Sequence, residues 1–597
     1  MSSLPVTERS NPLTANIDIS LPEDIVSLLQ HCDREIFHGW DNQTEGQKDL
    51  DQLKGLLDGR TIRLVEKIAG EVANLLRKPS DNLIVLSGCG TSGRLAFLTA
   101  RTFNKWLREL DMPECFRYVI AGGDKALFTS QEAPEDDPVL GAKKLQEVCA
   151  GKKKVLYIGI TCGLSASFVA GQLDFCMDNL DTYIPVLMGF NPVDLAKNLP
   201  IENWSKTILE VCKRLENLQK TKNCCIINPI IGPEPITGSS RMKGGTATKI
   251  LLDVMFAQGF SLFKEKQLRN TEQFLETYLT VNEAIGHCRQ YIGAVINLAG
   301  QCLRKHGHIY YIGADSLGIL AMIDASECPP TFGTSLDGVR GFLIGGFDEL
   351  RNQEGNISVL GRHFSIAVDD FQSTILPNLQ NSDIVIFINH GSAMNTSLLP
   401  LLATVQNGPA ESAVIHIMNS EQSGQEKMKE VPKTTNKITV QLPWIQIQEL
   451  FGPEHLDLSF KLFAEIATKW VCNAVTTGAH IMQGKVYQNY MVDLRVSNNK
   501  LFHRAVRIVE TFSGCNKEDA QEYLLKSIYG TDVLTGQQTT ANVSQHILQA
   551  TSQEKVVPTA LVCAILKCSL LEAQKHLAEE PVIRSAITSC LEKKNVE

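Results

Sequence analysis

The sequence has no uninterrupted apolar stretch close to the roughly 18 residues that a membrane-spanning helix requires. Its first nine residues lack the apolar core of a signal peptide, and Ser2 stands where N-myristoylation requires glycine. An excess of positive charge is also missing, since the formal net charge is -9 at pH 7. Electrostatic binding of nucleic acid along its phosphate backbone needs a positively charged surface. We therefore expect neither a membrane nor a nucleic acid as a partner.

The 17 cysteines are odd in number and contain no Cys-x-x-Cys spacing. Many lie inside apolar helix or strand patterns, as Cys472 and Cys563 do. This usage is typical of buried thiols in a reducing compartment. His306 and His308 form a short pair, but the pair runs into a strand pattern with no cysteine or carboxylate partner nearby. We expect no metal and no cofactor.

At 597 residues the chain is too long for a single core, and two or three domains are expected. Short apolar runs alternate with helical segments in two series, the pattern of parallel sheets covered by helices. The first series predicts strands at residues 83–86, 117–120, 155–160, 183–188 and 225–228. The second predicts strands at residues 308–312, 365–368, 383–389, 413–418 and 437–441, after a long helical stretch from 244 to about 305.

The first forty or so residues carry a short helical pattern through Ile25, Leu28 and Leu29, and no strand is expected after about Leu494. The last part predicts short amphipathic helices at residues 501–512, 517–527, 559–567 and 571–577, with a mobile polar connection at 530–552. We therefore divide the chain into an N-terminal segment (1–44) that is expected to pack with the cap, two α/β domains (45–270 and 271–490) and a helical cap (491–597).

Residues 83–102 and 308–327 repeat one strand–loop–helix unit. When Gly90 is set against Asp315, the strands, the glycine turns and the helix starts coincide. The first copy keeps a loop that can wrap an anion but has Thr102 where the second copy has Glu327. The second copy has an aspartate in the loop, a poor residue to face a phosphate. The repeat predicts one phosphate site and one remodelled site.

Three loops rich in glycine, serine and threonine follow strand ends in the first α/β domain, at residues 88–93, 161–167 and 237–246. Open parallel sheets bind ligands at this edge, where helix N-termini offer free N–H groups to an anion. Hydroxyls add neutral donors, although such residues also serve simply as helix caps. We expect the phosphate to lie on Thr91, Ser92, Ser239 and Ser240, with Thr161, Gly163 and Ser165 close by and with Gly90 in the loop that wraps the anion.

The first loop nearly matches a nucleotide-binding P-loop. Arg94 replaces the lysine that contacts phosphate, and Leu95 replaces the Ser/Thr that holds Mg²⁺. Both departures argue against ATP.

The hydroxyl-rich loops resemble those of the sugar isomerase (SIS) domain, a fold that binds phosphosugars. Residues 88–95, 232–249 and 484–500 resemble N-acetylmuramic acid 6-phosphate etherase, which has one SIS domain per chain and pairs two chains. Two SIS-like domains in tandem plus a helical cap are the layout of the glucokinase regulatory protein family. The resemblance covers nearly the whole chain.

The etherase family uses an acidic residue in Asp-Ala-Ser-Glu-Cys-Pro-Pro-Thr, directly after its Gly-Thr-Ser-Gly-Arg loop, and such chemistry needs a proton carrier within reach. Here that motif survives at residues 324–331 of the second domain and is missing after the first loop. Glu327 is either a group that reaches the ligand in the first domain or an inherited interface residue. The resemblance also implies a site role for Glu135, whose place matches an acidic loop of the etherase and whose alternative is a solvated loop. Lys500 opens the cap, where a long cation can fold over the ligand; its alternative is a solvated helix start.

The regulator resemblance implies that the chain is no enzyme. It implies that the chain inhibits glucokinase and takes fructose 6-phosphate and fructose 1-phosphate as modulating ligands in carbohydrate metabolism. It further implies retention of glucokinase in the nucleus and location in nucleus and cytoplasm. We expect a monomer, because the tandem domains supply internally the pairing that single-SIS enzymes obtain by dimerising. Leu450 and Phe451, in a stretch bounded by prolines, are the expected partner contacts, with a core role as the alternative. The other functions considered are a phosphosugar etherase or isomerase and a phosphosugar sensor without a protein partner.

Overall fold

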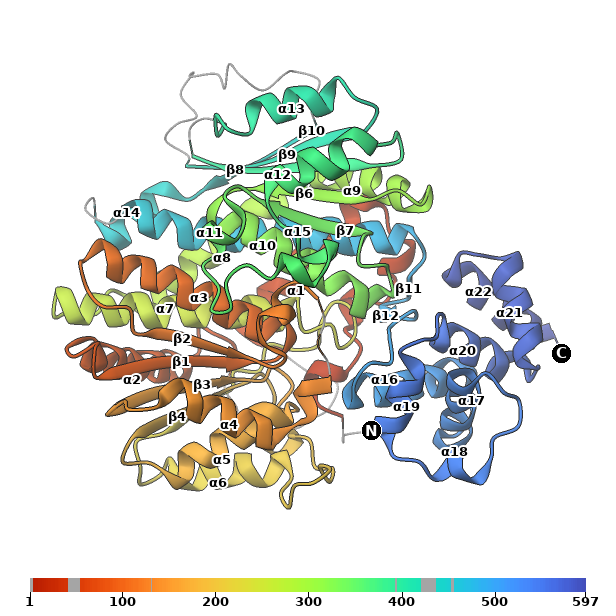
Figure 1. The fold of residues 1–597 in the computed structure, drawn as a ribbon, viewed down its shortest axis with the longest axis horizontal. Helices are drawn as coiled ribbons and strands as arrows, with labels where there is room; N and C mark the ends of the chain where they lie inside the picture. Colours follow the sequence, from red (N-terminus) through yellow and green to blue (C-terminus); the bar gives the residue numbers. More distant parts are fainter. Residues whose placement is uncertain are drawn as a thin grey trace.

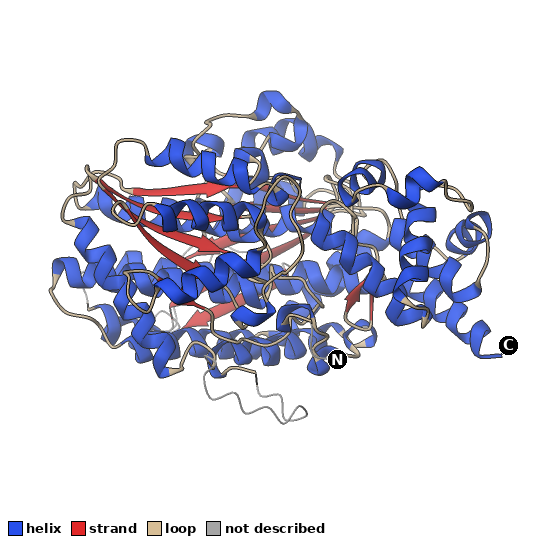
Figure 2. Cartoon of the chain, turned by 90° about the horizontal axis from the view of Figure 1, so that it is seen from below, coloured by secondary structure: helices blue, strands red, loops and turns tan. Residues whose placement is uncertain are grey.

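The computed structural model describes residues 4–40, 54–129, 131, 133–391, 394–419, 436–452 and 456–596. Two α/β domains lie one above the other, and a helical cap lies against one side of the pair (Figure 1). Seen from below, the cap is an all-helical body beyond the ends of both sheets (Figure 2). This arrangement confirms the predicted fold class.

The first sheet has five parallel strands in the order β2-β1-β3-β4-β5. They are β1 Asn82–Gly88, β2 Phe116–Ile120, β3 Lys154–Ile160, β4 Tyr183–Met188 and β5 Cys225–Ile227. One face is covered by α2 Gly59–Leu76, α3 Gly90–Glu109 and α7 Lys243–Lys264, and the other by α4 Pro138–Cys149, α5 Ser167–Asp178 and α6 Ile208–Leu218. Ile84 and Leu86 face the first set, whereas Leu83 and Val85 face the second, as the period of a strand requires. All five strands predicted for this domain are confirmed.

The second sheet has the order β10-β9-β8-β6-β7, again all parallel. Its strands are β6 Ile309–Gly313, β7 Val339–Leu343, β8 Ile384–His390, β9 Glu411–Asn419 and β10 Asn436–Leu442. Its helices are α8 Thr271–His287, α9 Arg289–Arg304, α10 Asp315–Phe332, α11 Gly346–Leu350, α12 Val368–Asp370, α13 Leu399–Gln406, α14 Trp444–Phe451 and α15 Leu456–Met482. In both sheets the strands run second, first, third, fourth and fifth in chain order. The identical topology supports the predicted duplication.

One predicted strand of the second series was wrong. Residues 365–368 form only a single bridge, between Leu343 and Ala367, and the strand next to β6 is β7. Sequence patterns missed β7 because Arg340 and Gly341 interrupt its apolar run. Gly341 is needed at its position, since a Cβ atom there would lie 2.6 Å from the side chain of Met322.

The N-terminal helix α1 Pro22–His38 packs against α8, α9 and α15 of the second domain. A two-stranded hairpin, β11 Val486–Tyr487 and β12 Tyr490–Met491, leads into the cap. The cap consists of α16 Asn499–Ser513, α17 Lys517–Tyr529, α18 Gly536–Thr540, α19 Val543–Ala550, α20 Val556–Leu566, α21 Leu570–Glu579 and α22 Ile583–Val596. Among the described residues no single helix is long and apolar enough to cross a membrane, and α20 with α21 meets that test only as a pair bent by 109°.

The polar connection predicted at 530–552 is mostly structured. It contains α18 and α19, and Thr535 caps α18 by accepting from the N–H of Gln538. In α19, His546 is buried, stacks on Phe502 and bonds to the Tyr529 hydroxyl at 3.0 Å. These tertiary contacts order a segment whose polar composition had indicated a loop.

The two residues expected to contact a partner lie inside the molecule. Leu450 and Phe451, at the end of α14, are 5% and 4% exposed. The Phe451 ring packs edge-on against Phe274 at 5.1 Å, and the Arg269 guanidinium lies over it at 4.9 Å. The side chains therefore belong to the core, which corrects their assignment to a surface. Ile445, on the same helix, is 61% exposed.

We expect Phe451→Ala to lower the free energy of unfolding by about 3–5 kcal/mol, because it leaves a cavity among aromatic side chains. Ile445→Ala is the matched control on the same helix and should change it by less than about 0.5 kcal/mol. Urea unfolding followed by circular dichroism measures both. Equal midpoints for Phe451→Ala and the native chain would show that the ring is not packed in the core.

Candidate functional site

The three hydroxyl-rich loops of the first domain meet in one cavity at the carboxyl ends of its strands. The cavity is open to solvent, and its empty space together with that open part amounts to about 890 Å³. Its walls come from the first domain, from α10 of the second domain and from the start of the cap. Every residue predicted to contact the ligand lines it: Gly90, Thr91, Ser92, Glu135, Thr161, Gly163, Ser165, Ser239, Ser240, Glu327 and Lys500.

The first wall is the start of α3. Gly90 has a φ of +48°, and a Cβ atom at Gly88 would lie 2.7 Å from Ser92, so the turn requires glycine. No side chain caps α3 at Cys89. The N–H groups of Thr91 and Ser92 therefore lack partners within the helix and can bind an anion.

The second wall is the loop after β3. The Thr161 hydroxyl oxygen accepts the N–H groups of Ser165 and Ala166 at 3.0 and 3.2 Å, which fixes the turn. Since the oxygen already serves as an acceptor, its proton remains available for donation to a ligand. Gly163 and Ser165 lie on the same turn and line the cavity.

The third wall is the loop before α7. Gly238 has a φ of +75°, and the Arg504 guanidinium of the cap packs on it so closely that a Cβ atom would lie 2.5 Å away. Thr237 bonds to Asn489 of the β11–β12 hairpin through its N–H at 2.8 Å. Ser239 and Ser240 are thus held between the first domain and the cap.

Glu327 reaches the cavity from α10 of the second domain. Its carboxylate forms an ion pair with Arg94 of α3, whose side chain is 1% exposed. Arg94 is therefore occupied by a side chain of the other domain, and the two domains build this wall together. Glu327 was expected either to reach the ligand site or to be an interface residue. The geometry is compatible with both roles, since Glu327 lies at the domain interface and lines the cavity.

The cap closes the remaining side. Asn498, the N-cap residue of α16, donates to Glu135 at 3.3 Å, and the N–H of Asn499 donates to Asp136 at 3.1 Å. Lys500 follows in the first turn and lines the cavity. The 3-10 turn that contains Glu135, Ala133–Asp136, is thereby attached to the cap.

The cap also binds the N-terminal segment. Arg504 and Arg507 both pair with Glu8, at 2.5 and 2.7 Å. Asn489 of the hairpin donates to the carbonyl oxygen of Asn11 at 2.9 Å. The N-terminal segment is therefore attached to Arg504, which lines the cavity.

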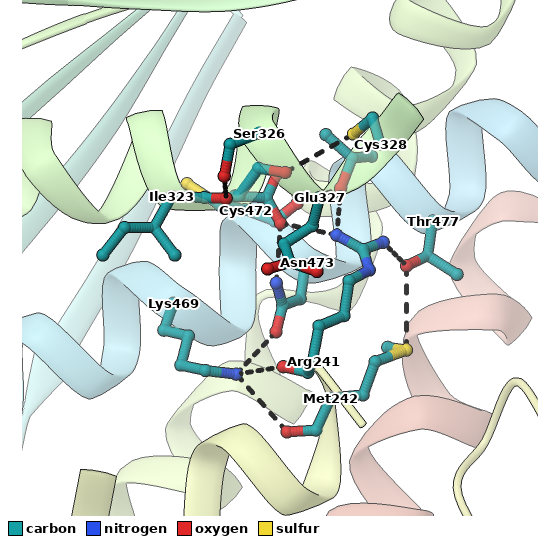
Figure 3. A network of polar contacts seen from close by, with 12 residues as sticks. Arg241, Met242, Ile323, Ser326, Glu327, Cys328, Lys469, Cys472, Asn473 and Thr477 are labelled. Atoms are coloured by element: carbon teal, nitrogen blue, oxygen red, sulfur yellow. Dashed lines mark hydrogen bonds and ion pairs between the residues drawn. The ribbon is translucent and has the colours of Figure 1, made fainter. Parts of the chain in front are cut away.

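A buried polar network connects the third loop to the second domain (Figure 3). Arg241 donates to Asp324 of α10 at 2.8 Å and to Thr477 of α15 at 2.6 Å. Asn473 bonds to the same aspartate at 2.6 Å, and Lys469 bonds to Asn473 at 2.7 Å and to the Arg241 carbonyl oxygen at 2.8 Å. The loop that carries Ser239 and Ser240 is therefore fixed by side chains of the other domain.

A second buried cluster lies behind the cavity. Glu234 accepts the N–H groups of Lys243 and Gly244 at 2.8 and 3.0 Å, so it fills the N-terminus of α7 with a carboxylate of the protein. Burial raises the pKa of Glu234 to about 7. Burial also raises the pKa of Asp33 on α1 and lowers the pKa of Lys469. Because Glu234 already occupies the N–H groups at the start of α7, that helix N-terminus is closed to an anion in the cavity, whereas the N-terminus of α3 remains open.

Sequence reasoning missed several residues that line the cavity: Asp136, Arg241, Asn498 and Arg504. Arg241 stands inside the third loop motif, and that position was the only available signal. Asn498 and Arg504 come from the cap, and no sequence pattern indicated that its first helix folds onto the cavity.

The chemistry of the cavity fits a phosphorylated sugar. Hydroxyl and backbone N–H groups on three loops offer neutral donors to a phosphate, and two carboxylates, Glu135 and Glu327, offer acceptors to sugar hydroxyls. Among the described residues no group of three or more His, Cys, Asp or Glu side chains is arranged to hold a metal ion.

Comparison with known proteins identifies three matching domains. They are the glucokinase regulatory protein N-terminal SIS domain at residues 67–177, its second SIS domain at 287–483 and its C-terminal lid domain at 488–587. The chain is 39% identical over 594 residues to glucokinase regulatory protein of Xenopus laevis, covering 99% of this chain and 93% of that protein. The chain belongs to the glucokinase regulatory protein family. The Homo sapiens member is 39% identical over 595 residues, with the same two coverages.

The similarity to etherases covers a smaller part of the chain. N-acetylmuramic acid 6-phosphate etherase of Synechocystis sp. is 34% identical over 250 residues, which cover 42% of the chain and 74% of the etherase. The proteins that match over the full length are named as regulatory proteins. The chain is accordingly a regulatory protein, in agreement with the prediction, and the etherase similarity is partial.

The network around Arg241 gives a test of how this family member joins its domains. We expect Asp324→Leu to lower the free energy of unfolding by about 3–5 kcal/mol, because it leaves the Arg241 guanidinium buried without a counter-charge. Removing both charges, with Arg241→Met and Asp324→Leu, should cost clearly less than the sum of the single variants. Chemical unfolding of the four proteins measures the coupling, and additive losses would show that the two groups do not interact.

Proposed function

We propose that the chain binds and inhibits a glucokinase and that a fructose phosphate in the cavity modulates the complex. The observation that carries the ligand assignment is the meeting of three hydroxyl-bearing loops with Glu327 in one cavity. Family membership supports the partner. Fructose 6-phosphate and fructose 1-phosphate both suit a site that combines phosphate donors with carboxylate acceptors for hydroxyls.

The position of the cavity supports a regulatory role for the ligand. The first domain, α10 and the cap all contribute to its walls. A ligand that contacts all three parts changes the balance between conformations in which they are closer or farther apart, because it binds those conformations unequally. A partner bound across these parts would sense that change.

For the partner surface we propose the exposed side of α14 in place of Leu450 and Phe451. Ile445 is the exposed large apolar side chain on this helix, and Trp444 beside it is half-buried. An apolar centre of this kind is a common feature of protein interfaces. We further propose that the complex retains glucokinase in the nucleus and that the chain occurs in both nucleus and cytoplasm, within carbohydrate metabolism.

Inhibition of purified glucokinase, with and without each fructose phosphate, tests the proposed function. We expect inhibition that changes when a fructose phosphate is added. Absence of inhibition at micromolar concentrations of the chain would contradict the partner, and release of product from N-acetylmuramic acid 6-phosphate would favour an etherase instead.

Ser92→Ala tests the ligand site. Ser92 lines the cavity at the start of α3, its hydroxyl lies 3.5 Å from the Cys162 sulfur, and a hydrogen bond to a charged group contributes about 1.5–3 kcal/mol. We therefore expect a loss of fructose-phosphate affinity of ~10-fold or more by calorimetry. Ser80→Ala, at an exposed position outside the cavity, is the control and should leave affinity unchanged. Unchanged affinity in a folded Ser92→Ala protein would place the ligand elsewhere.

We also propose that the chain is a monomer, since each α/β domain is paired with the other inside one chain. Ion pairs between Arg94 and Glu327 and between Arg241 and Asp324 join the two domains. Sedimentation velocity should show a single species near 65.9 kDa that does not change with concentration. A dimer that persists on dilution would show that the domains also pair between chains.

A further inference from the structure

The second copy of the phosphate loop has an aspartate where the first has glycine. Asp315 opens α10 with a φ of +51°, and Gly90 opens α3 with a φ of +48°, so the two loops share one backbone shape. Glycine adopts this conformation without cost, whereas other residues do so with strain. The backbone conformation at this position therefore favours glycine over aspartate. The reason for an aspartate here has to lie in the contacts of its side chain.

Three cations surround the Asp315 carboxylate. Arg101 and Lys105 of α3, in the first domain, approach it at 3.2 and 3.5 Å, and Lys461 of α15 forms a further ion pair. The side chain of Arg101 is 7% exposed. Burial raises the pKa of Asp315, but Lys461, Arg101 and Lys105 outweigh burial and hold the pKa well below its ordinary value. The carboxylate is thus a firmly ionised anion in a basic environment.

Ser316, which follows Asp315 in the first turn of α10, adds an unused donor. It occupies the position that Thr91 holds in the first copy, where Thr91 lines the ligand cavity. Ser316 is 2% exposed, and its hydroxyl has no hydrogen-bond partner among the described residues. A buried hydroxyl without a partner is costly in a folded protein. An unused donor at a helix N-terminus whose first residue is surrounded by cations is a feature of an anion site.

The charges around the carboxylate leave a positive excess. Arg101, Lys105 and Lys461 face Asp315 and Glu349, the latter paired with Arg101, and this gives a net charge of +1. Without Asp315 the same group has a net charge of +2. Glu465 also acts on Lys461, but it is paired with Lys249 at 2.7 Å. The environment therefore matches the two negative charges of a phosphate monoester better than the single charge of a carboxylate.

We infer that the second domain keeps a binding site for a phosphate monoester or inorganic phosphate at the start of α10, and that the chain occupies this site with its own Asp315 carboxylate. Because the carboxylate is already held in the site by the chain, it binds the cations without the entropic cost that a free phosphate pays on association. The native chain then has one exchangeable site, in the first domain. The internal anion in the second site holds α3 of the first domain against α10 at all times.

Asp315→Gly tests this inference with inorganic phosphate as the probe. Glycine relieves the left-handed backbone, removes the internal anion and leaves space beside the cations. Calorimetry should detect one more phosphate bound per chain than in the native protein, and phosphate should raise the melting temperature of the variant more than that of the native chain. The comparison is a difference between two proteins, so it does not depend on whether the first cavity takes a fructose phosphate.

Two controls separate the site from a general effect of charge. Asp315→Asn removes the charge but keeps the volume, and it should gain no site. Adding Lys461→Met to Asp315→Gly should weaken the new site ~10-fold or more, because it removes a charge-assisted bond. A crystal structure of Asp315→Gly in phosphate should show the anion between Arg101 and Lys461.

Several results would overturn the inference. They are an equal number of phosphates bound by Asp315→Gly and the native chain, an added site that survives Lys461→Met, and a phosphate located away from Arg101. If Asp315→Gly does not fold in phosphate-free buffer, the inference predicts recovery at saturating phosphate. Failure of both Asp315→Gly and Asp315→Ser to recover under that condition also counts against it.

Discussion

The buried ion pair between Arg241 and Asp324 is the constraint on which the rest of the architecture depends. Both side chains are almost fully buried, and they belong to different domains. A buried charge without its partner is strongly destabilising. Separating the domains would therefore leave Arg241 of one and Asp324 of the other without a counter-charge, and this holds the two domains together. Because Arg241 directly follows Ser239 and Ser240 in the chain, the contact that joins the domains also positions the ligand loop.

The two copies of the repeat have exchanged parts of their sites. The first domain supplies Arg101 to the second loop, and the second domain supplies Glu327 to the first cavity. In a pair of identical domains both sites would be composed in the same way. Here one loop keeps Gly90 and remains open, whereas the other has Asp315 and is closed by its own carboxylate. Duplication within one chain permits this division, because each copy can change without changing the other.

Sequence reasoning predicted the parts that depend on local periodicity. Buried parallel strands such as β4 appear as continuous apolar runs, and the ends of such strands meet at one edge, so the three loops could be placed together. It missed β7, because Gly341 interrupts the apolar run of this strand. Glycine is needed there, since the Met322 side chain leaves no room for a Cβ atom. It chose Phe451 as a partner contact and kept a core role as the alternative, because an apolar stretch between prolines has the same pattern in a core and at an interface; the core role is the one observed. Arg504 was beyond prediction, since it reaches the cavity only through the docking of the cap.

The cavity is therefore a junction, and this determines how a ligand there would act. Its walls are fixed differently. The third loop is held by the buried Arg241 network and by the contacts of Arg504 and Asn489. The loop that contains Glu135 is held by bonds from Asn498 and Asn499 at the start of the cap. Partly exposed hydrogen bonds open at a lower cost than a buried ion pair. A phosphosugar that competes for Glu135 would thus loosen or tighten the cap before it moved the domains. For a regulator with a ligand in this cavity, we therefore expect the first response at the loop that contains Glu135 and at the start of α16, with the paired domains as the more stable frame.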